Sequence, residues 1–382
     1  MRQVLLRFAV CWLCGNLVMG NGTTITSLRK PQVVIDLARL GWKDSPPESD
    51  KSFFKTYSIE KLEAMDGGAK LLYLSNDVLV AYHAIQENQE NKDWRSVRRE
   101  LEAFFISTHD GSLVFRQRWR TRWRKDTRDL WDSEARIIRV SDDRFLVHAD
   151  AALMLYSSTD YRLLKAKALE PAGLGDLWGA QSVPGGRYIL LRHGHLSRMY
   201  ATYEWLTSET LETMHRTESY ELSSPTAMEE SIVGDTRNGI QELTWDGHSE
   251  AACRCHACLE GGELTFLGPH SVAFLSKTAV GVIDTDHGLS WANDIDPGNI
   301  QVADLQSASL GKRFAFLVWG WKNARFHGER LDRHSTLLIY DLDKSVPVYR
   351  LDVGDGNVFA LSPDGTQIAV SHDNIVKVYS MK

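Results

Sequence analysis

The C-terminal end of the chain constrains the fold most, because it contains three consecutive β-strands and then stops. Residues 357–382 read as a strand, a turn over residues 362–365 (SPDG), a second strand, an Asp373-Asn374 turn and a third strand. Proline presets φ for the second turn position, and Gly365 tolerates the positive φ that such turns often need. Three strands without a fourth leave an open edge, so we look for the missing strand elsewhere in the chain.

The same strand–turn–strand pattern recurs through the sequence and predicts an all-β fold. First hairpins are expected at residues 70–80, 137–147, 180–191, 264–275, 302–318 and 359–370, with a weaker copy at 228–232. Second hairpins follow at residues 101–118, 151–167, 200–215, 240–253, 279–292 and 336–351. Two hairpins make a four-stranded unit, and units that recur about every 40–50 residues are typical of β-propeller blades. The only short helical candidate is Ser58–Met65.

Counting the units predicts seven blades. Six four-stranded units and the three terminal strands fall within the usual range of about 4–8 blades. Residues 32–37 form an isolated strand without a hairpin partner nearby, and we expect this strand to complete the C-terminal blade. Pairing both chain ends in one blade closes the ring. The expected fold is therefore a single all-β propeller over residues 32–382, preceded by a polar, flexible lead-in at residues 21–31.

The first 20 residues are interpreted as a signal peptide. Arg2 and Arg7 give a positive start, residues 8–19 are mostly apolar, and cleavage is expected after Gly20. The apolar run is short for a membrane span, which needs about 20 residues. An uncleaved anchor is the alternative. We expect a secreted or periplasmic protein whose mature chain has no transmembrane segment.

Charge and composition exclude some classes of partner. The net charge of −6 and the pI near 6.1 argue against a general nucleic-acid binder, whose domain would normally be basic. A hydrophobic fraction of 43% supports a large core and argues against wholesale disorder. We expect a monomer with no nucleic-acid partner.

Several third strands end in an aromatic or aliphatic residue followed by aspartate. These pairs are Trp245-Asp246, Ile283-Asp284 and Tyr340-Asp341. Together with the SPDG turn and the final strand at residues 375–379, they resemble the WD-repeat class of propellers or its divergent exported bacterial relatives. The Gly-His pair that normally opens a WD repeat is missing from nearly every blade. The resemblance implies a rigid platform for binding and does not identify a ligand.

Three cysteines lie close together between two expected blades: Cys253, Cys255 and Cys258. Removal of the signal peptide takes away Cys11 and Cys14, which leaves an odd number of thiols in an oxidising compartment. Spacing allows a Cys255–Cys258 or a Cys253–Cys258 disulfide. A tetrahedral metal site with His256 or His248 and unpaired or intermolecular thiols are the alternatives. Ligands this close together in sequence cannot all reach one metal ion easily, and no second zinc knuckle follows. The disulfide is therefore favoured over the metal site.

An unusual run of alternating arginines follows the second hairpin of the first blade. In an extended strand one face carries Arg116, Arg118, Arg120, Arg122 and Arg124, and the other face carries Trp119 and Trp123. Such a stripe can bind phosphate, sulfate or carboxylate groups of a partner. The alternative is an outer blade strand with a packed tryptophan face and a solvated arginine face, neutralised by Asp126, Asp129, Asp132 and Glu134.

The remaining candidates carry weaker signals. His193 and His195 follow a second strand, while Asp284, Asp286 and His287 cluster at a turn whose composition is also ordinary turn chemistry. The tryptophans near strands are expected to fill the spaces between blades rather than to bind sugars. No nucleophile elbow, phosphate loop or paired zinc knuckle is present, so we assign no catalytic, cofactor or metal residue.

The sequence therefore favours an exported, non-enzymatic scaffold that binds a protein, peptide or glycan through loops on one face. The alternative is an enzyme that uses the central channel, for instance a lactonase- or lyase-like hydrolase with a divalent metal. That alternative requires side chains from several blades to converge in the channel.

Overall fold

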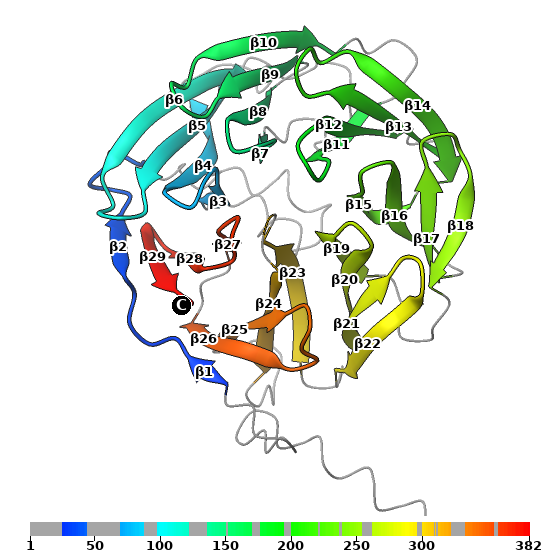
Figure 1. Cartoon of the computed structure of the whole chain (residues 1–382). Helices are drawn as coiled ribbons and strands as arrows, with labels where there is room; N and C mark the ends of the chain where they lie inside the picture. Colours follow the sequence, from blue (N-terminus) through cyan, green and yellow to red (C-terminus); the bar gives the residue numbers. More distant parts are fainter. Residues whose placement is uncertain are drawn as a thin grey trace, which may run out of the picture.

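The computed structural model of the chain describes residues 25–43, 69–87, 98–121, 136–149, 152–169, 176–194, 200–220, 222–236, 239–253, 262–295, 300–308, 310, 312–321, 333–354 and 358–382. In these residues seven sheets surround a central axis, and the first strand of each sheet lies innermost (Figure 1). The predicted seven-bladed β-propeller is confirmed. The predicted signal peptide and the helical candidate Ser58–Met65 lie outside the described residues.

The strands follow one another from the axis outward within each blade. The first four blades are β3–β6 (Lys70–Tyr73, Val78–Glu87, Arg98–Ser107, Leu113–Thr121), β7–β10 (Arg136–Arg139, Arg144–Ala149, Ala152–Ser157, Leu163–Ala168), β11–β14 (Asp176–Ser182, Tyr188–Gly194, Tyr200–Thr207, Thr213–Tyr220) and β15–β18 (Ser223–Ala227, Ser231–Thr236, Gly239–Thr244, Ser249–Cys253). The next are β19–β22 (Gly262–Gly268, Ser271–Ser276, Ala279–Asp284, Gly288–Asp294) and β23–β26 (Ile300–Ser307, Arg313–Trp321, Arg333–Asp341, Pro347–Gly354), and the last blade contains β27–β29 (Val358–Leu361, Gln367–His372, Ile375–Ser380).

The ring closes as the sequence predicts. Strand β2 (Val33–Asp36) pairs antiparallel with β29, from Val33 opposite Val378 to Asp36 opposite Ile375, and so becomes the outer strand of the last blade. The polar segment before it also contributes, because Thr26 and Ser27 form β1 and pair in parallel with Tyr349 and Arg350 of β26. The N-terminal segment therefore contacts two neighbouring blades.

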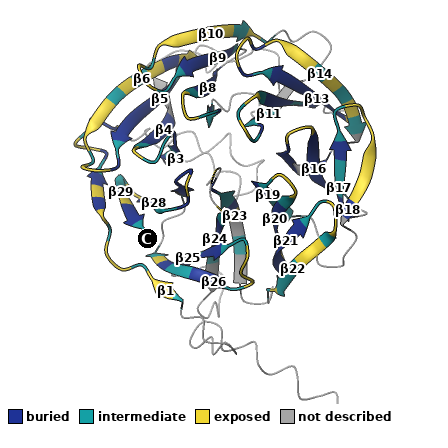
Figure 2. Ribbon diagram, viewed as in Figure 1, coloured by how far each residue is buried: buried dark blue, intermediate teal, exposed yellow. Residues whose placement is uncertain are grey.

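The burial of each strand follows from its place in the blade. Strand β8 is buried on both faces and is almost continuously apolar, whereas the outer strand β10 is mostly exposed. Figure 2 shows the same change from buried inner strands to exposed outer strands around the ring. The core lies between blades, as in the cluster that joins Phe105 and Trp119 of one blade to Phe145 and Tyr156 of the next.

The turns on one face of the ring are joined in the same way in every blade. A backbone N–H at the end of the third strand donates to a carbonyl in the turn between the first two strands, at 2.7 to 3.1 Å. The pairs are Thr108–Asp77, Ser158–Asp143, Ser208–Arg187, Trp245–Glu230, Thr285–His270, Leu342–Lys312 and Met381–Thr366. We call the turns between first and second strands, together with those between third and fourth strands, the turn face. The repeated bond ties the two sets of turns to each other in every blade.

Side chains also link the inner parts of neighbouring blades. Each junction between blades has a hydrogen bond of this kind: Arg139 Nε to Leu74 O, Ser182 Oγ to Val140 O, Gln181 Nε2 to Pro225 O, Gly262 N–H to the Asp235 carboxylate, Leu305 N–H to Glu263 Oε2, Gln306 Nε2 to Phe359 O, and Asp364 N–H to Asn76 Oδ1. These bonds satisfy polar groups that the central strands would otherwise leave without partners.

Candidate functional site

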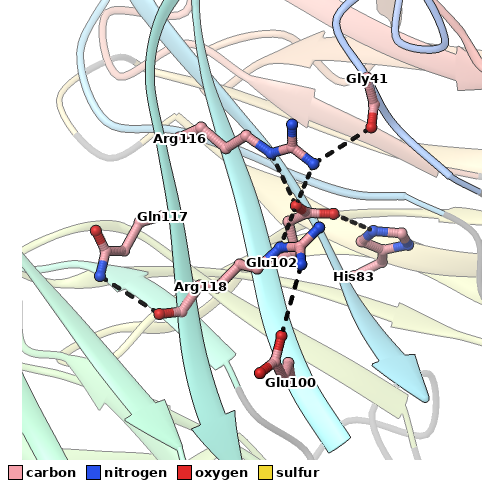
Figure 3. Close-up of polar contacts among 7 residues, drawn as sticks. All are labelled: Gly41, His83, Glu100, Glu102, Arg116, Gln117 and Arg118. Atoms are coloured by element: carbon pink, nitrogen blue, oxygen red, sulfur yellow. Dashed lines mark hydrogen bonds and ion pairs between the residues drawn. The ribbon is translucent and has the colours of Figure 1, made fainter. Parts of the chain in front are cut away.

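A buried carboxylate lies within the first blade. Glu102 of β5 is fully buried and faces His83 on β4, whose Nε2 lies 3.4 Å from Glu102 Oε2 (Figure 3). Arg116 and Arg118 of β6 each donate from Nε to Glu102 Oε1, at 2.8 and 2.7 Å. Cross-strand pairing places Arg118 directly opposite Glu102. Three donors from two strands therefore surround one carboxylate.

This arrangement determines the charge of Glu102. Burial alone raises the pKa of Glu102, but the hydrogen bonds from Arg118, Arg116 and His83 outweigh burial and hold that pKa below its usual value. The cluster also reaches the N-terminal segment, because Arg116 Nη2 donates to the Gly41 carbonyl at 3.3 Å. Next to it, Trp42 stacks on His83 with ring centroids 3.7 Å apart. The Glu102 cluster thus connects the first blade to the segment that closes the ring.

The structure places part of the predicted arginine stripe. Arg116, Arg118 and Arg120 lie exposed on β6, the outermost strand of its blade, and Trp119 is buried on the opposite face. Trp119 Nε1 donates to the Tyr156 hydroxyl of the next blade at 2.9 Å. Arg122 and Arg124 lie outside the described residues, as do the acidic residues expected to neutralise them. Glu102 neutralises part of the charge of the stripe, because it pairs with Arg116 and Arg118. Binding of an anionic partner by the stripe stays a prediction.

A second buried carboxylate lies in the third blade, next to the predicted candidate His193. Glu204 Oε2 lies 3.2 Å from His193 Nε2, and Glu204 Oε1 accepts from Thr213 and Arg216. Lys167 of the preceding blade lies 3.9 Å from the same oxygen. Burial raises the pKa of Glu204, but the bonds from His193 and Thr213 and the two positive charges lower it to about 2.

Sequence reasoning missed the buried carboxylates of Glu102 and Glu204. Each is a glutamate within a third strand that is otherwise mostly apolar at its centre, in the segments LEAFF and TYEWL. A charged residue in such a strand is rarely buried unless it is paired, and this was a usable signal. Because both clusters link strands within a blade and reach a neighbouring segment, they act as structural ion networks. His195 lies outside the described residues.

The predicted cysteine site is only partly within the described residues. The backbone of Cys253 ends β18, opposite Ile240. Cys255 and Cys258 lie outside the described residues. The disulfide stays a prediction.

The turn face carries many exposed charged side chains in the part of the chain that the structure describes. Acidic side chains outnumber basic ones in its turns. The exposed acidic residues are Asp77, Asp110, Asp142, Asp143, Asp160, Glu209, Glu212, Glu229, Glu230, Asp246, Asp286, Asp343 and Asp364, against Arg162, Arg187, Lys312 and Lys344. Four exposed histidines accompany them: His109, His248, His270 and His287.

Local hydrogen bonds lower the pKa of four of these carboxylates, those of Asp110, Asp160, Asp246 and Asp364. The backbone N–H of Ser112 and the hydroxyls of Ser107 and Ser112 lower the pKa of Asp110 to about 2. The bond from the Ser157 hydroxyl and the N–H of Arg162 likewise lower the pKa of Asp160. The turn chemistry that shapes this face therefore also extends the negative charge of these side chains to more acidic pH.

The turn face brings together the predicted candidates Asp284, Asp286 and His287. His287 Nδ1 lies 2.9 Å from Asp284 Oδ1. A residue that the sequence did not point to joins them, because His270 Nδ1 lies 3.0 Å from Asp286 Oδ2. Among the described residues, Asp284, Asp286 and His287 form the one group of three or more His, Cys, Asp or Glu side chains close enough to share an ion.

The inner strands contain a different acidic pair. Asp304 lies at a bulge of β23 with φ of 59°, and its N–H donates to Glu263 Oε1 at 3.2 Å. Although Asp304 keeps contact with solvent, desolvation by the surrounding chain, followed by the charge of Glu263, raises the pKa of Asp304 to about 6. A non-glycine residue at positive φ is uncommon and marks a position under strain. Two carboxylates alone do not make the convergent metal site that a channel enzyme would require.

Comparisons with known proteins find likeness at the level of structure. Neither a family model nor a curated protein sequence matches the chain. Among solved structures, Kluyveromyces lactis Hsv2p matches with a TM-score of 0.46 at 11% identity, over 80% of this chain and 90% of that one. The AfRom2 CNH domain gives 0.45 at 10% identity, over 83% and 94% of the two chains. Kuenenia stuttgartiensis hydrazine synthase gives 0.43 at 10% identity, over 65% and 76%.

At these identities and TM-scores, the likeness carries no argument about activity or partners. The part of the chain that the structure describes contains no helix with the length and apolarity that crossing a bilayer requires. What stands is a divergent seven-bladed β-propeller with two buried carboxylate clusters and an acidic turn face.

Proposed function

We propose that the chain is an exported, non-enzymatic scaffold that binds a cationic protein or peptide through its turn face. The observation that carries this proposal is the excess of exposed acidic side chains on a face whose turns are joined by the same backbone bond in all seven blades. Export rests on the predicted signal peptide. A cationic protein or peptide fits the charge of this face better than a neutral glycan does.

Two physical effects support binding at this face. Turns already held in place lose little conformational freedom when a partner docks, so less of the interaction energy is consumed in ordering them. A surface of one sign also attracts a partner of the opposite sign and speeds their encounter, in a salt-dependent manner. Lowered carboxylate pKa values keep this attraction intact in mildly acidic surroundings.

Charge reversal on the turn face tests the proposal. Glu229 and Glu230 are exposed in one turn, and the Glu229 carboxylate lies 3.7 Å from Arg187 of the neighbouring blade, an exposed pair whose loss should cost little stability. We expect the chain to bind a lysine-rich peptide saturably, and the double variant Glu229→Lys/Glu230→Lys to weaken binding at least about threefold, with a shallower dependence on salt. Isothermal titration calorimetry at two salt concentrations measures both effects.

The matched control lies in the same blade. Glu250 is exposed on the outer strand β18, away from the turn between β15 and β16. Glu250→Lys should leave affinity unchanged, because it alters the net charge without altering the turn face. Glu250→Lys changes the net charge by half as much as the double variant, so a weakening in that proportion would mean that overall charge, and not the turn face, attracts the peptide.

A separate experiment tests the alternative that the chain is an enzyme. That alternative requires reproducible turnover of a substrate that is lost when an inner-strand carboxylate is removed, with Asp304→Asn as the first variant because of its raised pKa. Such turnover would contradict the scaffold proposal, whatever the result of the peptide titration.

A further inference from the structure

We infer that the turn face of blade β19–β22 contains a binding site for a divalent transition metal of the Zn²⁺ class. Asp284, Asp286 and His287 would supply one ligand atom each, and His270 a fourth. The ligand atoms of the first three residues already lie within 4.8 Å of one another. This inference is independent of the cationic partner proposed above.

The blade architecture brings these four side chains together from two turns. His270 lies in the turn between β19 and β20, and Asp286 and His287 lie in the turn between β21 and β22. The backbone bond from Thr285 N–H to the His270 carbonyl, 2.9 Å long, fixes the two turns against each other. His270 is thereby held beside Asp286, with Nδ1 3.0 Å from Oδ2.

The aspartate that begins the second turn is oriented by the backbone. Asp284 Oδ1 accepts from the N–H groups of Asp286 and His287, each at 3.0 Å, and lies 2.9 Å from His287 Nδ1. These bonds involve only one carboxylate oxygen of Asp284, so Oδ2 remains available as a ligand. Asp284 is also the least exposed of the four side chains, at 31%.

The donor set fits a particular class of ion. Two imidazole nitrogens and two carboxylate oxygens suit Zn²⁺, Co²⁺, Ni²⁺ or Cu²⁺, whereas Ca²⁺ and Mg²⁺ favour oxygen ligands alone. Tetrahedral ligands at about 2.0–2.2 Å from an ion lie roughly 3.3–3.6 Å from one another. The His270 Nδ1–Asp286 Oδ2 pair is slightly closer than this, and the exposed side chains can reach that spacing by small rotations.

The first blade provides an internal comparison. There His109 Nε2 lies 2.9 Å from Asp77 Oδ1. This contact joins the turn between the third and fourth strands to the turn between the first and second strands, as the contact between His270 and Asp286 does in its own blade. The neighbouring Asp110 accepts hydrogen bonds from the N–H and the hydroxyl of Ser112. The described turns of that blade contain no second histidine. His109 therefore has the same kind of local pair without the full donor set, and is a matched control.

Metal titration of the full chain tests the inference. After treatment with a chelator and removal of that chelator, the protein is titrated with Co²⁺ and with Zn²⁺ by calorimetry, and the Co²⁺ absorption spectrum is recorded. We expect one equivalent to bind, with affinity weakened at least about tenfold by His270→Ala and by His287→Ala and unchanged by His109→Ala. Circular dichroism checks that each variant is folded.

The Co²⁺ spectrum separates this site from the cysteines. Nitrogen and oxygen ligands give only weak visible bands, whereas thiolate ligands add an intense charge-transfer band in the near ultraviolet. Binding with that band, retained in His287→Ala, would assign the metal to the thiols and overturn the inference. Absence of saturable binding, or equal affinity in all three histidine variants, would overturn it as well.

Discussion

Tyr161 of the second blade lies flat against Phe115 of the first, with ring centroids 4.5 Å apart and ring planes 7° apart. Tyr161 closes the turn between β9 and β10 at φ of 57°, in the left-handed region that normally favours glycine. The preceding blade has Gly111 and the following blade has Leu211 at the equivalent position. Turns that begin at residues 107, 157 and 207 thus share one conformation, and in two of them the strained residue packs against its surroundings.

Replacement of Tyr161 separates the backbone strain from the packing. Tyr161→Gly relieves strain of about 1–2 kcal/mol but loses ring burial and stacking, which are worth more. Tyr161→Ala keeps the strain and loses the ring as well. We expect stability to fall in the order wild type, Tyr161→Gly, Tyr161→Ala, with a first step of about 1–2 kcal/mol. Urea unfolding measures it, and a glycine variant as stable as wild type would show that the ring contributes no more than the backbone strain costs.

Removal of the two arginines around Glu102 should cost more stability than removal of the carboxylate charge. Arg116 and Arg118 are partly exposed and can return to water, but Glu102 is completely buried. We expect Arg116→Met/Arg118→Met to destabilise by about 3–5 kcal/mol, because it leaves a buried charge without its main partners. Glu102→Gln should cost about 1–2 kcal/mol, since its amide oxygen still accepts hydrogen bonds. Guanidinium denaturation of both variants tests the order, and the reverse order would contradict it.

Acid should destabilise the wild type more than Glu204→Gln. The folded-state pKa of Glu204 is lowered to about 2, so its contribution is present above the unfolded-state pKa of about 4.3 and is lost as pH falls through the folded value. The contribution is up to about 3 kcal/mol for this nearly buried group. We expect the stability difference between wild type and Glu204→Gln to shrink between about pH 5 and pH 2. Thermal unfolding across this range checks it, and a constant difference would show that Glu204 does not titrate with folding.

The sequence pattern predicted the blades but not the individual contacts between turns and between blades. Alternating and apolar segments separated by turn residues were enough to place the hairpins and to pair residues 32–37 with the C-terminal blade. Strand identity is a local property, and so it is visible in a short window. By contrast, Tyr161 occupies a glycine-type position because of a ring on another blade, and no local rule indicates that. His270 and Asp286 meet only because two turns of one blade lie together, which makes that contact a consequence of the fold.

Trp42 offers the most direct test of how the ring closes. It is buried after the closing strand β2, stacks on His83 and lies 5.3 Å from the ring of Phe104, so it joins the N-terminal segment to the first blade. Trp42→Ala should cost about 3–5 kcal/mol, the usual range for a buried tryptophan. Val34 is exposed by 55% on β2 itself, and Val34→Ala is the control, expected to change stability by less than about 0.5 kcal/mol.

If closure of the ring holds the terminal blade together, Trp42→Ala will also make residues 358–382 more susceptible to limited proteolysis, because β2 pairs directly with β29. Mass spectrometry of the fragments identifies the cleavage sites. Loss of global stability without early cleavage in the terminal blade would mean that Trp42 stabilises the first blade alone. Early cleavage there would show that seven blades unfold from the junction at which both chain ends meet.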